Sequence, residues 1–173
     1  SGKSAWAESL AMALGGRKCY IATMEPFGEE AEIRIQHHRN ARREKGFQTA
    51  EIYTGMAHSV GTLCCDTALL ECMTNWMANE MYSPSGAGKD ALGAVKKGID
   101  ALCAAVSNLV VVSGDLFCEG LDYGPYTGEY LENLAEVSRC LSARADLVVE
   151  LCCGIPIVHR HNDVGRAWLE KMA

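Results

Sequence analysis

Short apolar runs alternate with segments of helical periodicity along almost the whole chain, and this alternation limits the possible folds more than any single motif does. The runs have the length of typical strands and are too apolar to have one face in water. They span residues 18–23, 48–53, 67–72, 108–114 and 146–151. The helical segments span residues 3–14, 28–44, 73–82, 89–106 and 127–144. This order predicts an α/β fold, with a mostly parallel sheet that helices cover on both faces.

The length of the chain predicts one domain. Its 173 residues are enough for one hydrophobic core, and no internal repeat or low-complexity segment interrupts them. We therefore expect a single domain over residues 1–173. The composition of residues 83–90 is typical of a surface loop. Residues 158–173 form a C-terminal extension, in which residues 161–173 have the pattern of one more amphipathic helix.

The charge balance of the chain is acidic. Sixteen Lys and Arg residues against 22 Asp and Glu residues give a formal net charge of −6. This balance disfavours nucleic acid and anionic membranes as partners, because both repel an acidic protein. The longest apolar runs are also much shorter than the roughly 20 residues that a helix needs to cross a bilayer. The sequence therefore predicts neither a nucleic-acid partner nor a membrane span.

The nine cysteines include two adjacent pairs and no CxxC spacing. This pattern is typical neither of a disulfide framework nor of a structural zinc site. Most of the cysteines lie in apolar runs, where a thiol packs as a small hydrophobic side chain. We therefore expect mostly buried, reduced cysteines and a cytoplasmic protein.

The first four residues, SGKS, precede a helical segment and match the end of a P-loop, GxxxxGK[ST]. In that motif backbone amides and the helix N-terminus bind phosphates, the lysine reaches the outer phosphates and the hydroxyl binds magnesium. Lys3 and Ser4 would take the last two roles. The strand before the motif and its first glycine are absent, so we expect this chain to begin within its P-loop. The alternative is an incidental tripeptide.

Two polar residues lie at the ends of predicted strands, where ligands bind in parallel α/β sheets. Glu71 lies at the end of TALLEC, a position at which P-loop enzymes place an acidic residue that orients magnesium and its water ligands. Thr23 ends KCYIAT. The alternatives are a solvated strand end for Glu71 and a cap of the next segment for Thr23. The residue types alone do not decide between them.

The sequence RIQHHR, residues 34–39, places two histidines among arginines in a helical segment. Residues four apart share a helix face, so Arg34, His38 and Arg42 line up. His37 points about 100° away. Diverging histidines and nearby arginines argue against a metal site. One interpretation is a solvated basic face. The other is nucleophilic catalysis at phosphorus, in which the arginines keep the His38 imidazole neutral and stabilise phosphate oxygens and a pyrophosphate leaving group.

Taken in order, these motifs resemble one known family. SGKS, YIAT, RIQHHR, LLEC and ADLVVELCCGIPI, from Ser1 to about Ile157, are similar to the bifunctional adenosylcobinamide kinase / adenosylcobinamide-phosphate guanylyltransferase family. The resemblance implies a RecA-like P-loop NTPase fold and a transferase of cobalamin biosynthesis. It implies that ATP or GTP phosphorylates adenosylcobinamide, and that GMP from GTP is carried on a histidine to the new phosphate, which gives adenosylcobinamide-GDP. The family's guanylylated histidine is the second of the HH pair, which falls on His38.

Residue-by-residue matching to the family implies further site residues and partners. Mg²⁺ is expected at Ser4 and Glu71, partly through water, and the expected substrates are GTP, ATP and adenosylcobinamide. Family members form compact oligomers, commonly trimers, so the resemblance implies a homo-oligomer. The implied nucleotide-binding residues are Ser1, Gly2, Lys3, Ser4, Ala22, Thr23, Met24, Arg39, Asn40, Ala41, Arg42, Glu51 and Glu71.

The sequence departs from the family pattern at two places. Gly114 and Asp115 stand where the family usually has Asn-Glu, and Ser138 stands where an Asn is expected. These departures concern the corrinoid contacts and the kinase step rather than His38. Two alternatives therefore stay open: a P-loop kinase of another small alcohol, and a nucleotide-binding module with impaired catalysis.

Overall fold

The computed structural model describes residues 2–26, 42–116 and 124–172, and their elements alternate as the sequence predicts. The strands are β1 (Lys18–Ala22), β2 (Phe47–Glu51), β3 (Thr67–Glu71), β4 (Asn108–Val112), β5 (Leu147–Cys152) and β6 (Ile155–His161). The α-helices are α1 (Lys3–Leu14), α3 (Met56–Ser59), α4 (Met73–Tyr82), α5 (Ala91–Ala105), α6 (Gly124–Arg144) and α7 (Asp163–Met172). The short 3-10 helices are η1 (Val60–Thr62) and η2 (Gly88–Asp90).

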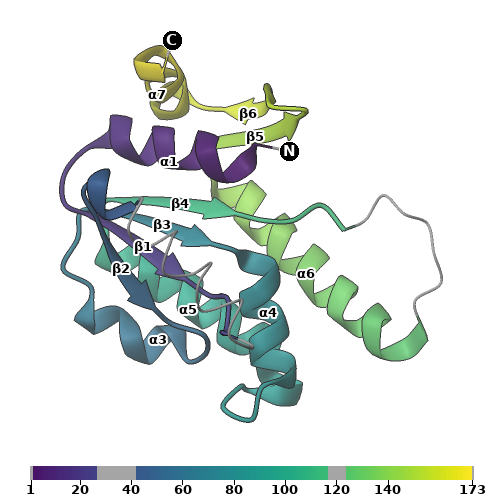
Figure 1. The fold of residues 1–173 in the computed structure, drawn as a ribbon. Helices are drawn as coiled ribbons and strands as arrows, with labels where there is room; N and C mark the ends of the chain where they lie inside the picture. The colour runs from purple at the N-terminus through teal and green to yellow at the C-terminus, as the bar shows by residue number, and fades with distance from the viewer. Residues whose placement is uncertain (1, 27–41, 117–123, 173) are drawn as a thin grey trace.

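The first four strands form one parallel sheet in the order β2-β1-β3-β4. Lys18 at the start of β1 pairs in register with Phe47 of β2 and Thr67 of β3, so the strands begin and end level with one another. Figure 1 shows α1 on one face of this sheet and α3, α4, α5 and α6 on the other. The predicted α/β fold, with a parallel sheet between two layers of helices, is confirmed.

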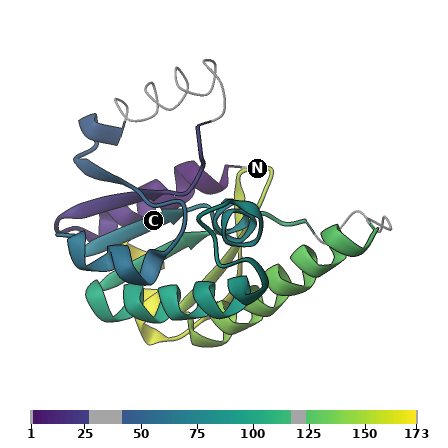
Figure 2. The same cartoon turned by 90° about the horizontal axis from the view of Figure 1, so that it is seen from below.

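Alternate residues of the strands pack on opposite faces of the sheet, as the strand pleat requires. Ile21 and Leu70 belong to the larger core cluster, which α3, α4, α5 and α6 complete around the buried Trp76. Figure 2, which is seen from below, shows these helices on the viewer's side of the sheet. Tyr20 and Leu69 belong to a smaller cluster on the face that α1 covers. The two clusters explain why the strands of the sheet are apolar on both sides.

The fifth predicted strand is real but lies outside the parallel sheet. β5 pairs antiparallel with β6 in a separate two-stranded sheet. Cys153 (φ 50°) and Gly154 (φ 85°) both have positive φ, the conformation of a tight two-residue hairpin turn, so the chain reverses at once. β6 was not predicted, because it is exposed along its whole length and carries no pattern of burial. The extension that we expected from residue 158 therefore begins inside β6.

The helices follow the prediction closely. α1 and α4 have the predicted bounds, and α5 and α6 differ from them by a few residues. The expected C-terminal helix forms as α7, whereas α3 and η1 were not predicted because they are each only one turn long. Of the helix expected over residues 28–44, the structure describes only residues 42–44, which are helical. No helix in the described ranges is long and apolar enough to cross a membrane.

The eight cysteines in the described part of the chain are free thiols. Our expectation that most of them are buried is wrong, because only Cys19 and Cys65 are buried in this set. Cys64 and Cys103 are exposed, and so are Cys152 and Cys153 at the turn of the β5–β6 hairpin. Apolar neighbours in the sequence do not bury a thiol in a loop, on the open side of a helix or at a hairpin turn.

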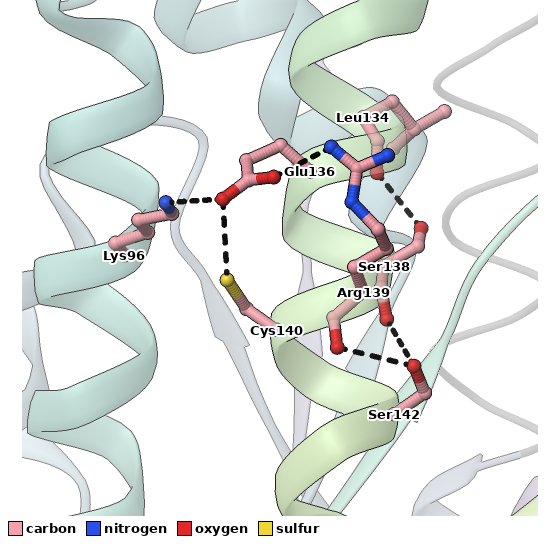
Figure 3. A network of polar contacts seen from close by, with 7 residues as sticks. All are labelled: Lys96, Leu134, Glu136, Ser138, Arg139, Cys140 and Ser142. Carbon is pink, nitrogen blue, oxygen red and sulfur yellow. Dashed lines mark hydrogen bonds and ion pairs between the residues drawn. The ribbon is translucent and has the colours of Figure 1, made fainter.

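A polar network on the surface joins α5 to α6 (Figure 3). Glu136 of α6 lies 2.9 Å from Lys96 Nζ of α5 and 2.6 Å from Arg139 Nη2 of its own helix. The hydrogen bonds from Lys96 and then from Arg139 lower the pKa of Glu136 from its ordinary value of 4.5 to about 2. The ionised carboxylate therefore supports the packing of the two helices above this pKa.

Substitution of Gly98, in α5, tests the packing of the larger core cluster. A Cβ atom at Gly98 would lie 2.6 Å from Trp76 Cζ2, whereas no heavy atom lies within 4 Å of one at Gly128 of α6. We expect Gly98→Ala to lower the free energy of unfolding by about 1–3 kcal/mol through overpacking. The control Gly128→Ala should raise it by about 0.5–1 kcal/mol, because alanine favours a helix. Urea unfolding measures both, and equal effects would contradict this packing.

Substitution of Glu136 tests the link between α5 and α6. Because folding lowers the pKa of Glu136, its contribution is complete above pH 4.5 and is lost as the pH falls towards about 2. We expect Glu136→Gln to be less stable than the unmutated protein at pH 6 and to lose this difference at low pH. Denaturant unfolding across this range measures the effect. The exposed Glu132 of the same helix provides the control Glu132→Gln, and an equal pH dependence there would contradict the assignment.

Candidate functional site

The carboxyl ends of β1, β2 and β3 lie side by side at one edge of the sheet. Ala22, the last residue of β1, is the register partner of Glu51 in β2 and of Glu71 in β3. The amide of Thr23 donates to the Glu71 carbonyl (3.1 Å), and the amide of Ile52 donates to the Ala22 carbonyl (3.1 Å). The structure thus brings together three of the predicted site residues, Ala22, Glu51 and Glu71.

Ser4 and Glu71 meet at this edge. Ser4 lies in the first turn of α1, and its Oγ donates a hydrogen bond to Glu71 Oε1. The sequence predicted these two residues as magnesium ligands from separate motifs 67 residues apart. Both side chains offer hard oxygen atoms, which are the ligands that Mg²⁺ prefers. The pair is therefore chemically suited to a divalent cation.

The start of α1 has the features of a phosphate-binding helix terminus. Gly2 precedes the helix in the left-handed conformation (φ 82°), which glycine adopts without a steric cost. No side chain caps the first turn, and no acidic residue lies in it. A Cβ atom on Gly2 would lie 3.2 Å from the Cα atom of Gly154, so the turn of the β5–β6 hairpin packs against this terminus. Lys3, predicted to reach phosphate, is the first residue of α1.

Tyr20, which was not predicted as a site residue, connects Glu71 to Arg42. Its hydroxyl donates to Glu71 Oε2 (2.8 Å) and accepts from Arg42 Nη2 (2.6 Å). Burial, and then the Glu71 carboxylate, raise the pKa of Tyr20, so the hydroxyl is protonated and can donate. From the sequence alone, Tyr20 is expected to be a hydrophobic core residue, because it lies in an apolar run. The available signal is that a hydroxyl-bearing residue lies two residues before the strand end, on the face that α1 covers.

Arg42 is the one predicted residue of the histidine segment that the structure describes, and it is well anchored. Its Cζ atom lies 3.3 Å from the centroid of the Tyr20 ring, a cation–π contact. Its Nε atom is buried, has no hydrogen-bond partner among the described residues and lies 3.7 Å from Glu8 Oε1 of α1. Glu8 also accepts from Lys45. Glu8 was not predicted as a site residue, because its partners lie more than 30 residues away in the sequence.

Thr23 closes the edge of the sheet between β1 and β3. The side chain is fully buried, and its Oγ1 donates to the Cys72 carbonyl and accepts from the Cys72 amide, both at 2.8 Å. Asn79 Nδ2 donates to the carbonyls of Thr23 (2.7 Å) and Tyr53 (3.1 Å). These contacts hold Thr23 between the ends of β1 and β3. Met24 follows it with an exposed side chain.

A buried carboxylate supports the loops behind this edge. Glu80 of α4 is 2% exposed and accepts from the Gly55 amide (2.8 Å), the Trp76 indole (3.1 Å) and the Ala87 amide (3.2 Å). Loss of such a partner leaves a buried donor unpaired, which costs about 1–3 kcal/mol. Glu80 therefore fixes the segment after β2 and the loop before α5.

The remaining predicted residues lie outside the described ranges. They are His38, the proposed nucleophile, together with Ser1, Arg39, Asn40 and Ala41. His37 and Arg34, which entered the helical-face argument, also lie there. Arg42 marks the point at which the described chain resumes, four residues after His38.

Comparison with family models decides the family. The model described as cobinamide kinase / cobinamide phosphate guanyltransferase, CobU, matches residues 1–159. The chain belongs to this family. A comparison with curated proteins gave no match.

Membership of the CobU family establishes the class of enzyme. CobU enzymes are transferases of cobalamin biosynthesis, and they act as cobinamide kinases and cobinamide-phosphate guanylyltransferases. ATP and GTP are their substrates. The predicted transferase function is therefore confirmed. Membership also favours it over a kinase of another small alcohol.

Proposed function

We propose that this chain is a RecA-like P-loop enzyme that phosphorylates adenosylcobinamide with ATP or GTP and then transfers GMP to it through a guanylylated His38. Family membership supports both reactions. One contact carries the assignment of the site: the hydrogen bond from Ser4 to Glu71, which joins the first turn of α1 to the carboxyl end of β3. A P-loop enzyme needs this juxtaposition of a phosphate-binding helix and an acidic strand end.

The first turn of α1 is the proposed binding site for the triphosphate. Its backbone amides and the positive end of the helix dipole attract phosphate oxygens. Lys3 adds a positive charge at the same end of the helix. The conformation of Gly2 supports the close approach of a phosphate to the backbone.

Ser4 and Glu71 are the residues that would hold Mg²⁺. Ser4 would supply its hydroxyl oxygen and Glu71 would act partly through water, because Mg²⁺ commonly keeps several water ligands. When bound, the ion offsets negative charge on the phosphate oxygens. The hydrogen bond between the two side chains supports this assignment, because it places both oxygen donors together before any ion binds.

In the kinase step the protein positions the triphosphate for an in-line displacement. The aminopropanol hydroxyl of adenosylcobinamide attacks the γ-phosphorus of ATP or GTP, and the bond to the bridging oxygen breaks. The hydroxyl proton is released and the nucleoside diphosphate leaves. Lys3 stabilises the charge on the transferred group. The buried Thr23 and the half-buried Asn79 keep the edge of the sheet in place.

In the guanylyl step His38 is the nucleophile. An imidazole nitrogen of His38 attacks the α-phosphorus of GTP, a P–N bond forms and pyrophosphate leaves. An oxygen of the adenosylcobinamide phosphate then attacks the same phosphorus, the P–N bond breaks and adenosylcobinamide-GDP is formed. Nearby arginines stabilise the leaving pyrophosphate. The anchored position of Arg42 supports this role, because it holds the end of the histidine segment against β1.

The wider assignment follows the family resemblance. We propose one catalytic domain over residues 1–173 and a homo-oligomer, commonly a trimer in the family. We place the reactions in the cytoplasm, where both nucleotides are available. The remaining nucleotide contacts that we propose are Ser1, Ala22, Thr23, Met24, Arg39, Asn40, Ala41, Arg42 and Glu51.

Labelling with GTP tests the histidine. The protein is incubated with Mg²⁺ and GTP that is radiolabelled at the α-phosphate, and we expect a covalent label that acid removes and base does not, as for a phosphoramidate. His38→Ala should abolish the label, and the control His37→Ala should retain it. No label on the unmutated protein, or a label that survives His38→Ala, would sink the assignment.

Substitution of Glu71 tests the cation site. Glu71→Gln keeps the size of the side chain but removes the charge, so we expect the kinase rate to fall by at least about tenfold, one transition-state contact being worth more than 1.4 kcal/mol. Phosphorylation of adenosylcobinamide by labelled ATP measures this rate. Glu150→Gln is the control, because Glu150 is an exposed glutamate of β5. Equal rates for the two variants would show that Glu71 has no role at the phosphates.

A further inference from the structure

Tyr20 lies between two parts of the proposed site: the Ser4–Glu71 pair, which is assigned to the cation, and Arg42, which follows His38 in the sequence. On one side its hydroxyl donates to Glu71, whose other carboxylate oxygen accepts from Ser4. On the other side it accepts from Arg42, four residues after His38. Both hydrogen bonds involve a charged partner, which makes them stronger than bonds between neutral groups. We propose that Tyr20 is a positioning residue that couples the cation-binding carboxylate to the histidine-bearing segment, an inference that rests on the proposed function.

The hydroxyl, and not only the ring, is needed for this coupling. Tyr20 is 3% exposed, so water does not replace a lost partner easily. Without the hydroxyl, Glu71 Oε2 loses a donor and Arg42 Nη2 loses an acceptor. The ring alone still packs in the smaller core cluster and still lies beneath the guanidinium. Removal of the hydroxyl alone therefore tests the positioning role of Tyr20 and leaves its packing intact.

The contacts around Tyr20 form a closed chain of residues, which begins and ends on α1. Ser4 binds Glu71, Glu71 binds Tyr20, Tyr20 binds Arg42, and Arg42 lies beside Glu8. Residues four apart lie on one face of a helix, so Ser4 and Glu8 are neighbours on α1. A rigid helix thus holds both ends of the chain of contacts. A change in the orientation of the Glu71 carboxylate would therefore reach Arg42 through the Tyr20 hydroxyl.

The test compares Tyr20→Phe with the control Tyr53→Phe. The control also removes a tyrosine hydroxyl, but from a residue outside this chain of contacts. Calorimetry gives the affinity for a GTP analogue with a methylene bridge between the β- and γ-phosphates, with Mg²⁺ and with EDTA. The ratio of the two affinities is the gain due to Mg²⁺. We expect Tyr20→Phe to reduce this gain about tenfold, the size of one hydrogen bond to a charged group. Tyr53→Phe should leave the gain unchanged.

Arg42→Lys provides a second, independent measurement that does not alter Tyr20. Lysine keeps the positive charge but loses the planar guanidinium that stacks on the ring and donates to the hydroxyl. If Tyr20 couples the two groups, Arg42→Lys also lowers the gain due to Mg²⁺, although the polar contacts of Arg42 in the described structure are to Tyr20 and Glu8 rather than to Glu71. A gain that stays at the control value in either Tyr20→Phe or Arg42→Lys would overturn the proposal.

The rate of covalent labelling by GTP distinguishes failure of this inference from failure of the proposed function. If GTP labels the unmutated protein, we expect Tyr20→Phe to slow this labelling about tenfold and Tyr53→Phe to leave its rate unchanged. An unchanged rate in Tyr20→Phe overturns the coupling while the function stands. If the unmutated protein takes no label, the proposed function fails, and the gain due to Mg²⁺ alone then supports or overturns the role of Tyr20.

Discussion

The register of β1 against its two neighbours is the constraint on which the rest of the site depends. Ala22 faces Glu51 on one side and Glu71 on the other, so three strand ends meet at one edge. Side chains alternate along a strand, and a slip of β3 by one residue would turn Glu71 to the opposite face of the sheet. It would then lie away from α1 and Ser4. Hydrogen bonds between Thr23 and Cys72 fix this register where the ladder ends.

Small residues on α1 explain why the helix comes close enough to use that register. Ala7 and Ala11 are buried in the smaller cluster against the sheet, and they lie three and seven residues after Ser4, on the same face of the helix. Larger side chains at these positions would move α1 away from the strands. Ser4 then could not donate to Glu71. The packing of an apolar cluster therefore sets the distance between two polar groups at its edge.

The sequence alone was sufficient for the parts of the molecule that repeat a physical pattern. Strands buried on both faces and helices with one apolar side can be recognised in the amino-acid sequence. Ser4 and Glu71 can be recognised too, because each lies at the end of a motif. The pairing of β5 with β6 was missed because it depends on two positive φ values at a turn. Tyr20 and Glu8 were missed because their partners are distant in sequence. A tyrosine in an apolar strand does not show, before folding, which groups its hydroxyl will meet.

The surroundings of Arg42 show why an arginine suits this position better than a lysine. Arg42 lies close to the Glu8 carboxylate and reaches Glu71 only through the Tyr20 hydroxyl, in a place where its side chain is 14% exposed. A lysine ammonium is a compact, strongly hydrated charge and would lose more hydration there, whereas a guanidinium is weakly hydrated and stacks on an aromatic ring. Lys45, which is more exposed, contacts the second oxygen of Glu8. The chain therefore places arginine where burial and stacking matter, and lysine where water is available to the ammonium group.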